Sequence, residues 1–158
     1  MAGRSKVVRP APAGFRSGPS PDQLCPCGGG SYAVCCGPLI EGREQARTAE
    51  QLMRSRYSAF ARAAQDPAAI EHLLRTHPQP DVPLGQRRLE LLRGSRGLQW
   101  FKLEVLACEA GGPDDAEGRV SFAAHWRQAG DGGVHRELSR FGRGPDGQWL
   151  YLEPIQLE

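Results

Sequence analysis

Hydrophobic residues recur along the chain at two periods, a helical one first and an alternating one later. Apolar side chains return at helical spacing from Leu52 to Ala64. Thr48 and Gln51, three positions apart, precede this stretch in the arrangement of a capping box. The pattern therefore predicts a helix that begins at Thr48.

Two further helices are predicted before the alternating region. Asp66 and Pro67 have the form of an N-cap followed by a first helical residue, and the apolar face that they introduce ends by Pro78. The sequence PQPDVP that begins there cannot form a regular element, because proline fixes the backbone and removes a hydrogen-bond donor. Residues 84–93 carry weaker signals for a third helix, which stops before Gly94.

Alternation replaces the helical period after Gly97. Residues 98–110 place Phe101 and Leu103 on one face of a strand and Trp100 on the other. Three more alternating stretches follow, joined by Gly-rich and Asp-Gly connections: RVSFAAHWRQ, VHRELSRFGR and QWLYLEP. Helices first and an antiparallel meander afterwards indicate an α+β fold, with the helices packed on one face of a curved antiparallel sheet.

The length of 158 residues is enough for one ordinary domain with a small appendage. We divide the chain into a disordered tail over residues 1–22, a small cysteine lobe over 23–40 and an α+β domain over 47–156. The tail contains Pro, Gly and Ser without an apolar period, so it cannot bury enough surface to order itself. No stretch approaches the roughly 20 apolar residues of a membrane span, and no signal-peptide core is visible, so we expect a cytoplasmic protein without a membrane partner.

The net charge of the chain does not indicate a particular class of binding partner. The formal net charge is +2, well short of the basic excess of a dedicated nucleic-acid-binding protein. Arg4, Lys6, Arg9 and Arg16 are spread thinly through the tail and make a weak patch. Nucleic-acid binding is therefore the weakest of the partner hypotheses.

Four of the five cysteines lie in the stretch CPCGGGSYAVCC. Four thiolates can surround one tetrahedral zinc ion, and the glycine-rich loop lets the backbone bend sharply enough to bring them together. Disulfides and a redox pair compete with this hypothesis, but the expected compartment is reducing, a bridge between adjacent cysteines is strained, and the C-x-x-C redox signature is missing. Cys108, on a strand with apolar neighbours, is expected in the core. The predicted ligands of a closed, structural zinc site are Cys25, Cys27, Cys35 and Cys36.

The same residues resemble known families. CPCGGGSYAVCC is similar to the SEC-C zinc motif, first recognised at the C-terminal tail of the secretion ATPase SecA. The strings TAEQLMRSRYSAF, HWRQ, HRELSRF and GQWLYLEP resemble the YchJ-like family of uncharacterised bacterial proteins, so that the likeness covers residues 24–154. It implies an N-terminal zinc knuckle and a nuclear-transport-factor-like (cystatin-like) domain, a cone of helices on a curved sheet. The family has no established reaction, so the resemblance implies no substrate.

A polar cluster is expected beneath the helices. Arg56 falls inside the apolar stripe of the first helix, so its guanidinium faces the core and needs a carboxylate or several carbonyls. Alternation places His135, Glu137 and Ser139 together on one strand face. We therefore predict an Arg56–Glu137 pair, with Tyr57 at the edge of the stripe able to join it. Such a pair more often ties a helix to a sheet than takes part in chemistry.

Other aromatic and histidine side chains are assigned mainly to packing. His77 lies on the apolar face of the second helix and points toward the core or the rim of a cavity, where a lone histidine is more often a hydrogen-bonded core residue than a catalyst. His72 falls off that face, so we expect it to be solvated. The large side chains of Trp100, Trp149 and Tyr151 are expected to form core rather than a ligand platform.

Two kinds of function fit these observations. The first is a non-catalytic module whose zinc lobe presents a rigid surface to a protein or ribonucleoprotein partner. The second is a small-molecule-binding protein or an enzyme of hydrolase or isomerase type, in which Glu137 or His77 acts as general base and Arg56 or Tyr57 stabilises charge. The second needs an open pocket of roughly 300 Å³ or more that touches these groups, whereas the first needs only a packed core. The closed metal site favours the module, so catalysis is not expected.

Overall fold

The structure is a computed structural model that describes residues 23–158, so the predicted tail over residues 1–22 lies outside the described residues. The helices are the 3₁₀ helix η1 (Tyr32–Val34), α1 (Gly37–Ile40), α2 (Ala49–Arg62), α3 (Pro67–Thr76) and α4 (Leu84–Ser95). The strands are β1 (Gln99–Ala110), β2 (Glu117–Gln128), β3 (Asp131–Arg143) and β4 (Trp149–Leu157). Within residues 23–158, no helix has the length and apolar character needed to cross a membrane.

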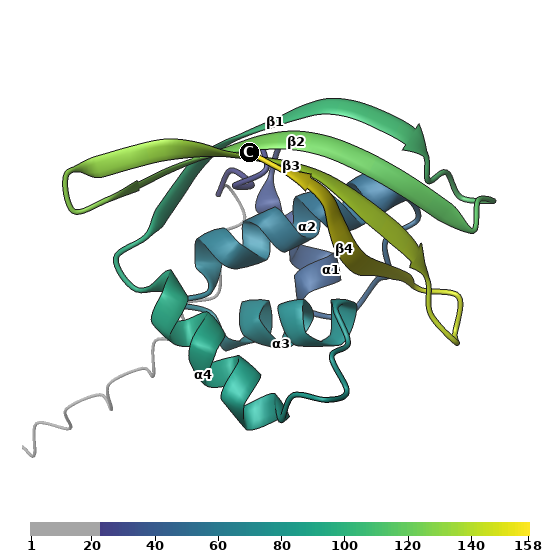
Figure 1. Cartoon of the computed structure of the whole chain (residues 1–158), viewed down its shortest axis with the longest axis horizontal. Coiled ribbons are helices and arrows are strands. Elements are labelled where there is room, and N and C mark those ends of the chain that lie inside the picture. Colours follow the sequence, from purple (N-terminus) through teal and green to yellow (C-terminus); the bar gives the residue numbers. More distant parts are fainter. Residues whose placement is uncertain (1–22) are drawn as a thin grey trace, which may run out of the picture.

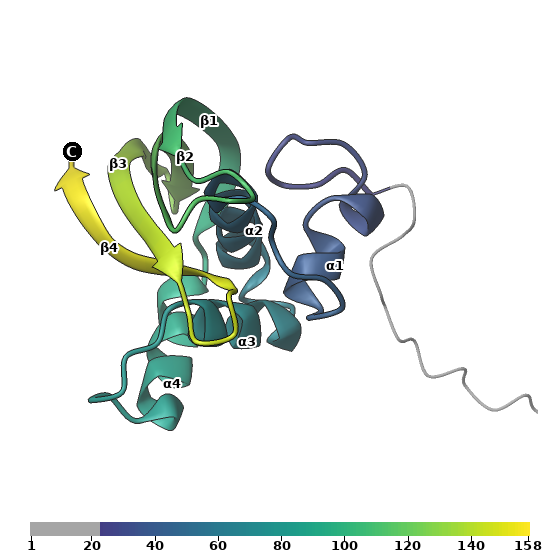
Figure 2. The same ribbon diagram turned by 90° about the vertical axis from the view of Figure 1, so that its right-hand side faces the viewer.

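The strands form one antiparallel sheet in the order β1-β2-β3-β4. The curved sheet arches over α2, and α3 and α4 lie on the far side of α2 from the sheet (Figure 1). The short helix α1 contacts α2 and α3 and stands beside them with the cysteine loops (Figure 2). This arrangement confirms the predicted α+β cone of helices on a curved antiparallel sheet.

The predicted helix starts are confirmed by their caps. The Thr48 hydroxyl accepts a hydrogen bond from the backbone N–H of Gln51 at 3.1 Å, and the Gln51 side chain accepts one from the N–H of Arg47 at 2.7 Å. Asp66 caps α3 by accepting from the N–H of Ala68 at 3.0 Å. These side chains satisfy N–H groups that have no partner inside a helix, which fixes where α2 and α3 begin.

A β-bulge corrects the predicted faces of β1. The pairing with β2 skips one residue between Trp100 and Lys102, so Phe101 is the extra residue. Trp100 and Leu103 consequently share the inner face and pack against the core, whereas Phe101 is 50% exposed. The prediction that Phe101 and Leu103 share a face was wrong, because one extra residue reverses the alternation.

The cysteine lobe and the helices share one hydrophobic cluster. Cys25, Cys27 and Cys36 are buried in the same cluster as Tyr57 of α2 and Leu73 of α3. The lobe therefore packs against the domain instead of standing apart from it. The domain boundary between residues 40 and 47 stays a prediction.

Two residues lie elsewhere than predicted. Cys108 is exposed, because it lies in the exposed C-terminal half of the edge strand β1, and its thiol donates to Glu50 at 3.3 Å. His72 is only 3% exposed rather than solvated. The reason is that α3 is covered by α1 as well as by α2, so its buried surface is wider than its apolar stripe.

Candidate functional site

The four clustered cysteines have the geometry of a tetrahedral metal site. Their sulfur atoms all lie within 4.8 Å of one another. The sulfurs of Cys27 and Cys35 are 3.5 Å apart, and those of Cys35 and Cys36 are 3.9 Å apart. In a tetrahedral zinc site with Zn–S bonds of about 2.3 Å, sulfurs stand roughly 3.8 Å apart. All four are free thiols, so the donor set fits a metal ion.

The glycine-rich loop makes this convergence sterically accessible. Gly28 and Gly30 adopt φ angles of 82° and 112°, a region that side chains strongly disfavour. A Cβ at Gly29 would lie 2.9 Å from the sulfur of Cys35, closer than real Cβ atoms approach. The backbone N–H of Cys25 donates to the carbonyl of Gly30 at 2.7 Å and closes the loop. The predicted sharp bend of this loop is present.

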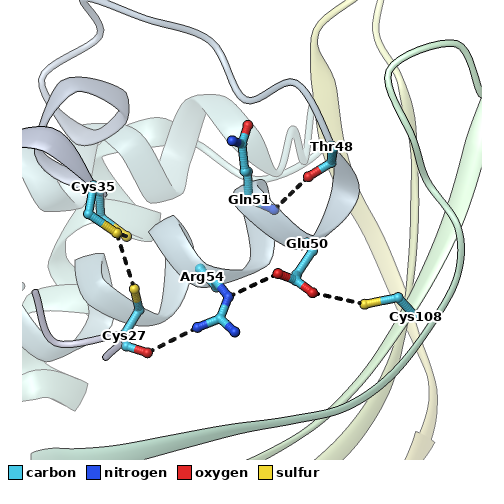
Figure 3. A network of polar contacts seen from close by, with 8 residues as sticks. Cys27, Cys35, Thr48, Glu50, Gln51, Arg54 and Cys108 are labelled. Carbon is cyan, nitrogen blue, oxygen red and sulfur yellow. Dashed lines mark hydrogen bonds and ion pairs between the residues drawn. The ribbon is translucent and has the colours of Figure 1, made fainter. Parts of the chain in front are cut away.

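Side chains of helix α2 make polar contacts with the cysteine cluster. The guanidinium of Arg54 donates from Nη1 to the carbonyl of Cys27 at 3.1 Å and from Nε to the carboxylate of Glu50 at 3.1 Å (Figure 3). On the same helix the hydroxyl of Ser58 lies 3.5 Å from the sulfur of Cys25. Groups of this kind orient the ligands of a metal site without touching the metal.

Without a metal ion, hydrogen bonds among the four thiols shift their pKa values in opposite directions. Hydrogen bonds from Cys27 and Cys36 lower the pKa of the Cys25 thiol, whereas the bond to Cys25 raises the pKa of Cys36. A bound cation would favour the thiolate form of every ligand, since metal binding releases the thiol protons. A zinc ion held by four thiolates would leave no open position for substrate and would act by fixing the lobe.

A second site lies between α2 and the sheet, where a partly open cavity of about 460 Å³ is present. Its wall is mainly apolar and aromatic, with Met53, Phe60, Trp100, Phe122, Ala124 and Phe141. Its polar lining consists of Arg56, Tyr57, His77, His135, Glu137, Ser139 and Tyr151. All five residues predicted for a pocket, Arg56, Tyr57, His77, Glu137 and Ser139, thus border one cavity.

Glu137 is the centre of a hydrogen-bond network in this cavity. Its Oε1 accepts from the hydroxyls of Tyr151 at 2.6 Å and Ser139 at 2.7 Å, and its Oε2 accepts from Nε2 of His135 at 2.9 Å. Burial opposes ionisation, but these three hydrogen bonds outweigh it and lower the pKa of Glu137. The carboxylate therefore stays charged, with both oxygens already engaged.

Arg56 is a buried cation on the opposite wall. It is 8% exposed, and its Nη1 donates to the carbonyl of Leu73 at 3.1 Å and to the hydroxyl of Thr76 at 2.7 Å. Its guanidinium carbon lies 4.8 Å from the ring centroid of Tyr151, a cation–π distance. Burial lowers the pKa of Arg56 to about 10, so the group remains protonated at neutral pH.

The predicted Arg56–Glu137 ion pair was wrong: the two side chains make no salt bridge within residues 23–158. Tyr151 lies between them, with its ring against Arg56 and its hydroxyl on Glu137. The Nη1 of Arg56 donates to acceptors on α3 in place of the predicted carboxylate. Sequence reasoning assigned Tyr151 to the core, because the alternation of QWLYLEP places it on the same strand face as Trp149, which is buried. The pattern does not show that Tyr151 also contacts Arg56 and Glu137 in the cavity.

His77 follows α3 as its C-terminal cap, is half-buried and lines the cavity. Its Nδ1 donates to the carbonyl of Tyr151 at 3.0 Å, because a carbonyl can only accept. Neutral His77 therefore carries an unprotonated Nε2, and burial lowers its pKa. A second cavity, of about 350 Å³, shares His77, Arg56, Phe60 and Trp100 with the first.

Tyr57 contributes its ring rather than its hydroxyl to the cavity. The hydroxyl is sealed from solvent and makes no hydrogen bond within residues 23–158. Burial raises the pKa of Tyr57 to about 12. Its ring meets Trp100 edge to face, with centroids 6.4 Å apart. Tyr57 therefore does not present a donor to a ligand in this arrangement.

Comparison with known proteins finds a family model and relatives that match most of the chain. The family model described as YchJ, middle NTF2-like domain, matches residues 48–154. A UPF0225 protein of Geobacter sulfurreducens is 41% identical over 131 residues, which cover 82% of this chain and 77% of the relative. A UPF0225 protein of Corynebacterium efficiens is 44% identical over 131 residues, covering 82% and 91% of the two chains.

A solved structure has the same architecture. The crystal structure of a SEC-C motif containing protein from Psychrobacter arcticus matches with a TM-score of 0.66 and 25% sequence identity. The match covers 85% of this chain and 83% of that one. The overall fold is therefore one that has been seen experimentally.

Proposed function

The chain belongs to the YchJ-like family of UPF0225 proteins, and from this membership and the geometry of the cone we propose that its NTF2-like domain binds a small molecule with an apolar body and a polar head group. The observation that carries the proposal is the cavity of about 460 Å³ that brings Arg56, Glu137 and His77 to one open space. It exceeds the roughly 300 Å³ at which ligand pockets begin. A cone that served only as a scaffold would be expected to fill this space with side chains.

The composition of the wall suits such a ligand. Ligand sites are mostly apolar and carry a few placed polar groups that fix orientation, which is the distribution found here. Arg56 and Glu137 are fixed in place by their own hydrogen bonds, so little ordering of the site would be needed on binding. The sequence alone favoured an interaction module. The open cavity favours ligand binding instead.

Tryptophan fluorescence offers a direct test, because Trp100 lines the cavity and the other tryptophans of the sequence do not. We expect titration with a small amphiphile such as octanol to change the emission, and the change to be lost in Trp100→Phe. Ala124→Leu, which narrows the cavity, should weaken binding, whereas Leu106→Phe on an exposed position of β1 should not. Saturable binding that Ala124→Leu leaves unchanged would place the ligand elsewhere.

We also propose that the cysteine cluster binds zinc and that the ion is structural. Support comes from the four-thiol donor set with sulfurs within 4.8 Å of one another, and from the likeness to a SEC-C motif containing protein. Metal analysis of the purified chain should give one zinc per molecule. Cys25→Ser should lose it, and a variant that keeps full zinc content would remove Cys25 as a ligand.

A partner surface on the lobe is the second candidate function. Leu24 directly precedes Cys25 and Val34 directly precedes Cys35, and the two side chains are 79% and 83% exposed. Apolar side chains held on a rigid metal lobe suit a protein partner with an apolar groove. If they are the contact, a double substitution of Leu24 and Val34 by Ser should abolish co-purification of a specific partner while zinc content stays at one per chain.

A further inference from the structure

We infer that the occupant of the cone is a small organic acid with one negative charge, whose carboxylate binds the free edge of Arg56 and whose apolar body lies on the aromatic wall. This inference rests on the proposed ligand-binding function and names the class of ligand. It is carried by the hydrogen-bond inventory of one buried side chain and by the charges that surround it.

The first step is the unused edge of the Arg56 guanidinium. Only its Nη1 has hydrogen-bond acceptors within the described residues, namely the carbonyl of Leu73 and the hydroxyl of Thr76. Its Nε and Nη2 have no acceptor among residues 23–158. Within residues 23–158, every buried side-chain N or O atom other than the Tyr57 hydroxyl either has a hydrogen-bond partner or is reached by solvent. Because Nε and Nη2 of Arg56 have no partner, solvent must reach them. The Nε and Nη2 edge of Arg56 is therefore open to the cavities that this residue lines.

That edge has the geometry of a carboxylate receptor. Two parallel N–H groups of a guanidinium match the two oxygens of a carboxylate in a bidentate pair. The contacts of Nη1 with α3, together with the rings of Tyr151 at 4.8 Å and Phe60 at 5.8 Å, hold the plane of the group fixed. The receptor is thus organised before a ligand arrives, which lowers the entropic cost of binding.

The second step is the missing counter-charge. Within the described part of the chain, neither Arg56 nor the buried Arg87 forms a salt bridge with a carboxylate. Arg87 instead donates to the backbone carbonyl of His77 and lines the second cavity. An unpaired buried cation is costly, and an anion that enters the cavity would relieve this cost.

The third step limits the ligand to a single charge. Glu137 borders the same cavity and is ionised, and its two oxygens are already occupied by three donors. It therefore repels a second negative charge placed near it, and three of its roughly four acceptor positions are already filled. Phosphate esters and dicarboxylates are disfavoured, while a monocarboxylate satisfies Arg56 and leaves the Glu137 side of the cavity to uncharged groups.

The part of the ligand beyond its carboxylate would contact the aromatic side chains that line the cavities. Trp100 is shared by both cavities, and Phe122, Phe141 and the ring of Tyr57 continue the wall in the first. Aromatic side chains contribute large apolar contact area, which favours an alkyl or aryl body over a sugar or a polar metabolite.

The test compares octanoate with octanol, two probes that differ in the head group, by calorimetric titration of the full zinc-loaded chain at neutral pH. We expect octanoate to bind roughly 10 to 100 times more tightly, the range for a charge-assisted hydrogen-bonded pair. Arg56→Gln should remove this difference, whereas Arg88→Gln, which affects an exposed arginine paired with Glu71, should preserve it.

Each outcome is decisive. Equal affinity for the two probes overturns the carboxylate inference and leaves the cavity a binding site for neutral amphiphiles. Failure of both probes to bind counts against the proposed function itself and against the inference built on it. If Arg56→Gln does not fold, the carboxyl carbon of carbon-13-labelled octanoate decides, because pairing with a guanidinium must lower the pKa of the bound acid. An unshifted or raised pKa overturns the inference.

Discussion

The phenol of Tyr151 donates to the carboxylate of Glu137 across 2.6 Å, while its ring lies 4.8 Å from the guanidinium carbon of Arg56. One side chain thus stabilises an anion through its hydroxyl and a cation through its ring. Tyr151 contacts both charged groups, which make no direct ion pair with each other within residues 23–158. This leaves part of Arg56 unpaired at the cavity.

Tyr151→Phe should isolate the contribution of this hydroxyl, because the ring against Arg56 is kept. Loss of the shortest hydrogen bond to Glu137 should lower the free energy of unfolding by about 1.5 to 3 kcal/mol, the range for hydrogen bonds to charged groups. The measurement is denaturant unfolding at neutral pH of wild type, Tyr151→Phe, Glu137→Gln and the double variant. Strictly additive losses in this cycle would show that the two residues are not coupled.

The pH dependence of that effect has a definite sign. The folded-state pKa of Glu137 is lowered, so its contribution is present above the unfolded-state pKa and is lost as pH falls through the folded-state value. The stability difference between wild type and Tyr151→Phe should therefore shrink in acid, below about pH 4. A difference that grows on acidification would contradict an ionised Glu137.

Much of the fold follows from local signals in the sequence. The side chains of Thr48 and Asp66 satisfy the first N–H groups of α2 and α3, which is a local interaction and can be recognised without tertiary information. The shared face of His135, Glu137 and Ser139 follows from the pleat of β3, which has no irregularity in its pairing with β2. Arg56 and Tyr57 of α2 and His77 at the end of α3 were placed toward the same space by helical periodicity instead.

The parts that were missed depend on tertiary structure. The bulge at Phe101 is set by pairing with β2, and no residue type in β1 marks it. His72 is buried because α1 covers α3, and a four-residue helix inside the cysteine lobe has too few turns to show a periodic pattern. The role of Tyr151 required knowing that β4 lies close enough to α2 for one ring to contact Arg56.

His72 should make the protein acid-sensitive. Arg75 can only donate, so Nδ1 of His72 accepts from it at 3.0 Å, and Nε2–H donates to the hydroxyl of Ser55 at 2.8 Å. Burial, together with the nearby cations Arg75 and Arg56, lowers the pKa of His72 to about 3. Since an unfolded histidine titrates near 6.5, the unfolded state binds more protons below that pH and stability must fall as pH falls.

The expected loss through this residue is about 2 to 3 kcal/mol between pH 6.5 and 4.5, by linkage over two pH units. His72→Gln removes the titrating group, so its unfolding free energy should change less over this range than that of the wild type. Both chains carry the same cysteines, so the difference between their curves cancels acid effects at the metal cluster. Parallel curves would show that His72 is not buried in its neutral form.

Metal removal should affect more than the lobe. Cys25, Cys27 and Cys36 are buried with Tyr57 and Leu73 in one cluster, so a lobe that loosens uncovers parts of α2 and α3. Cys25→Ser should therefore lose zinc and lower the cooperative unfolding free energy of the whole domain by several kcal/mol, of the order expected when a structural metal is lost. Cys108→Ser, an exposed thiol outside the cluster, is the matched control and should change neither.

Hydrogen exchange during chelation shows whether the cysteine lobe unfolds alone or together with the helices. If exchange in β2 and β3 is unchanged while only residues 23–40 lose protection, the lobe unfolds on its own and the shared cluster contributes little. If protection falls along α2 as well, the lobe and the helices form one cooperative unit.

Arg54 tests how far α2 controls the metal site from outside it. Its Nη1 donates to the carbonyl of Cys27, and Glu50 holds the same guanidinium by an ion pair at 3.1 Å (Figure 3). Arg54→Met keeps the length and helix propensity of the side chain but removes the donor to the ligand loop. Because loss of groups that orient metal ligands typically costs about 10- to 100-fold in affinity, competition with a chromogenic chelator should show zinc affinity reduced by that factor. Arg88→Met, on the exposed face of α4, controls for loss of a surface charge, and an Arg54→Met affinity equal to that of this control would mean that the four thiolates and their glycine loop set the site without help from α2.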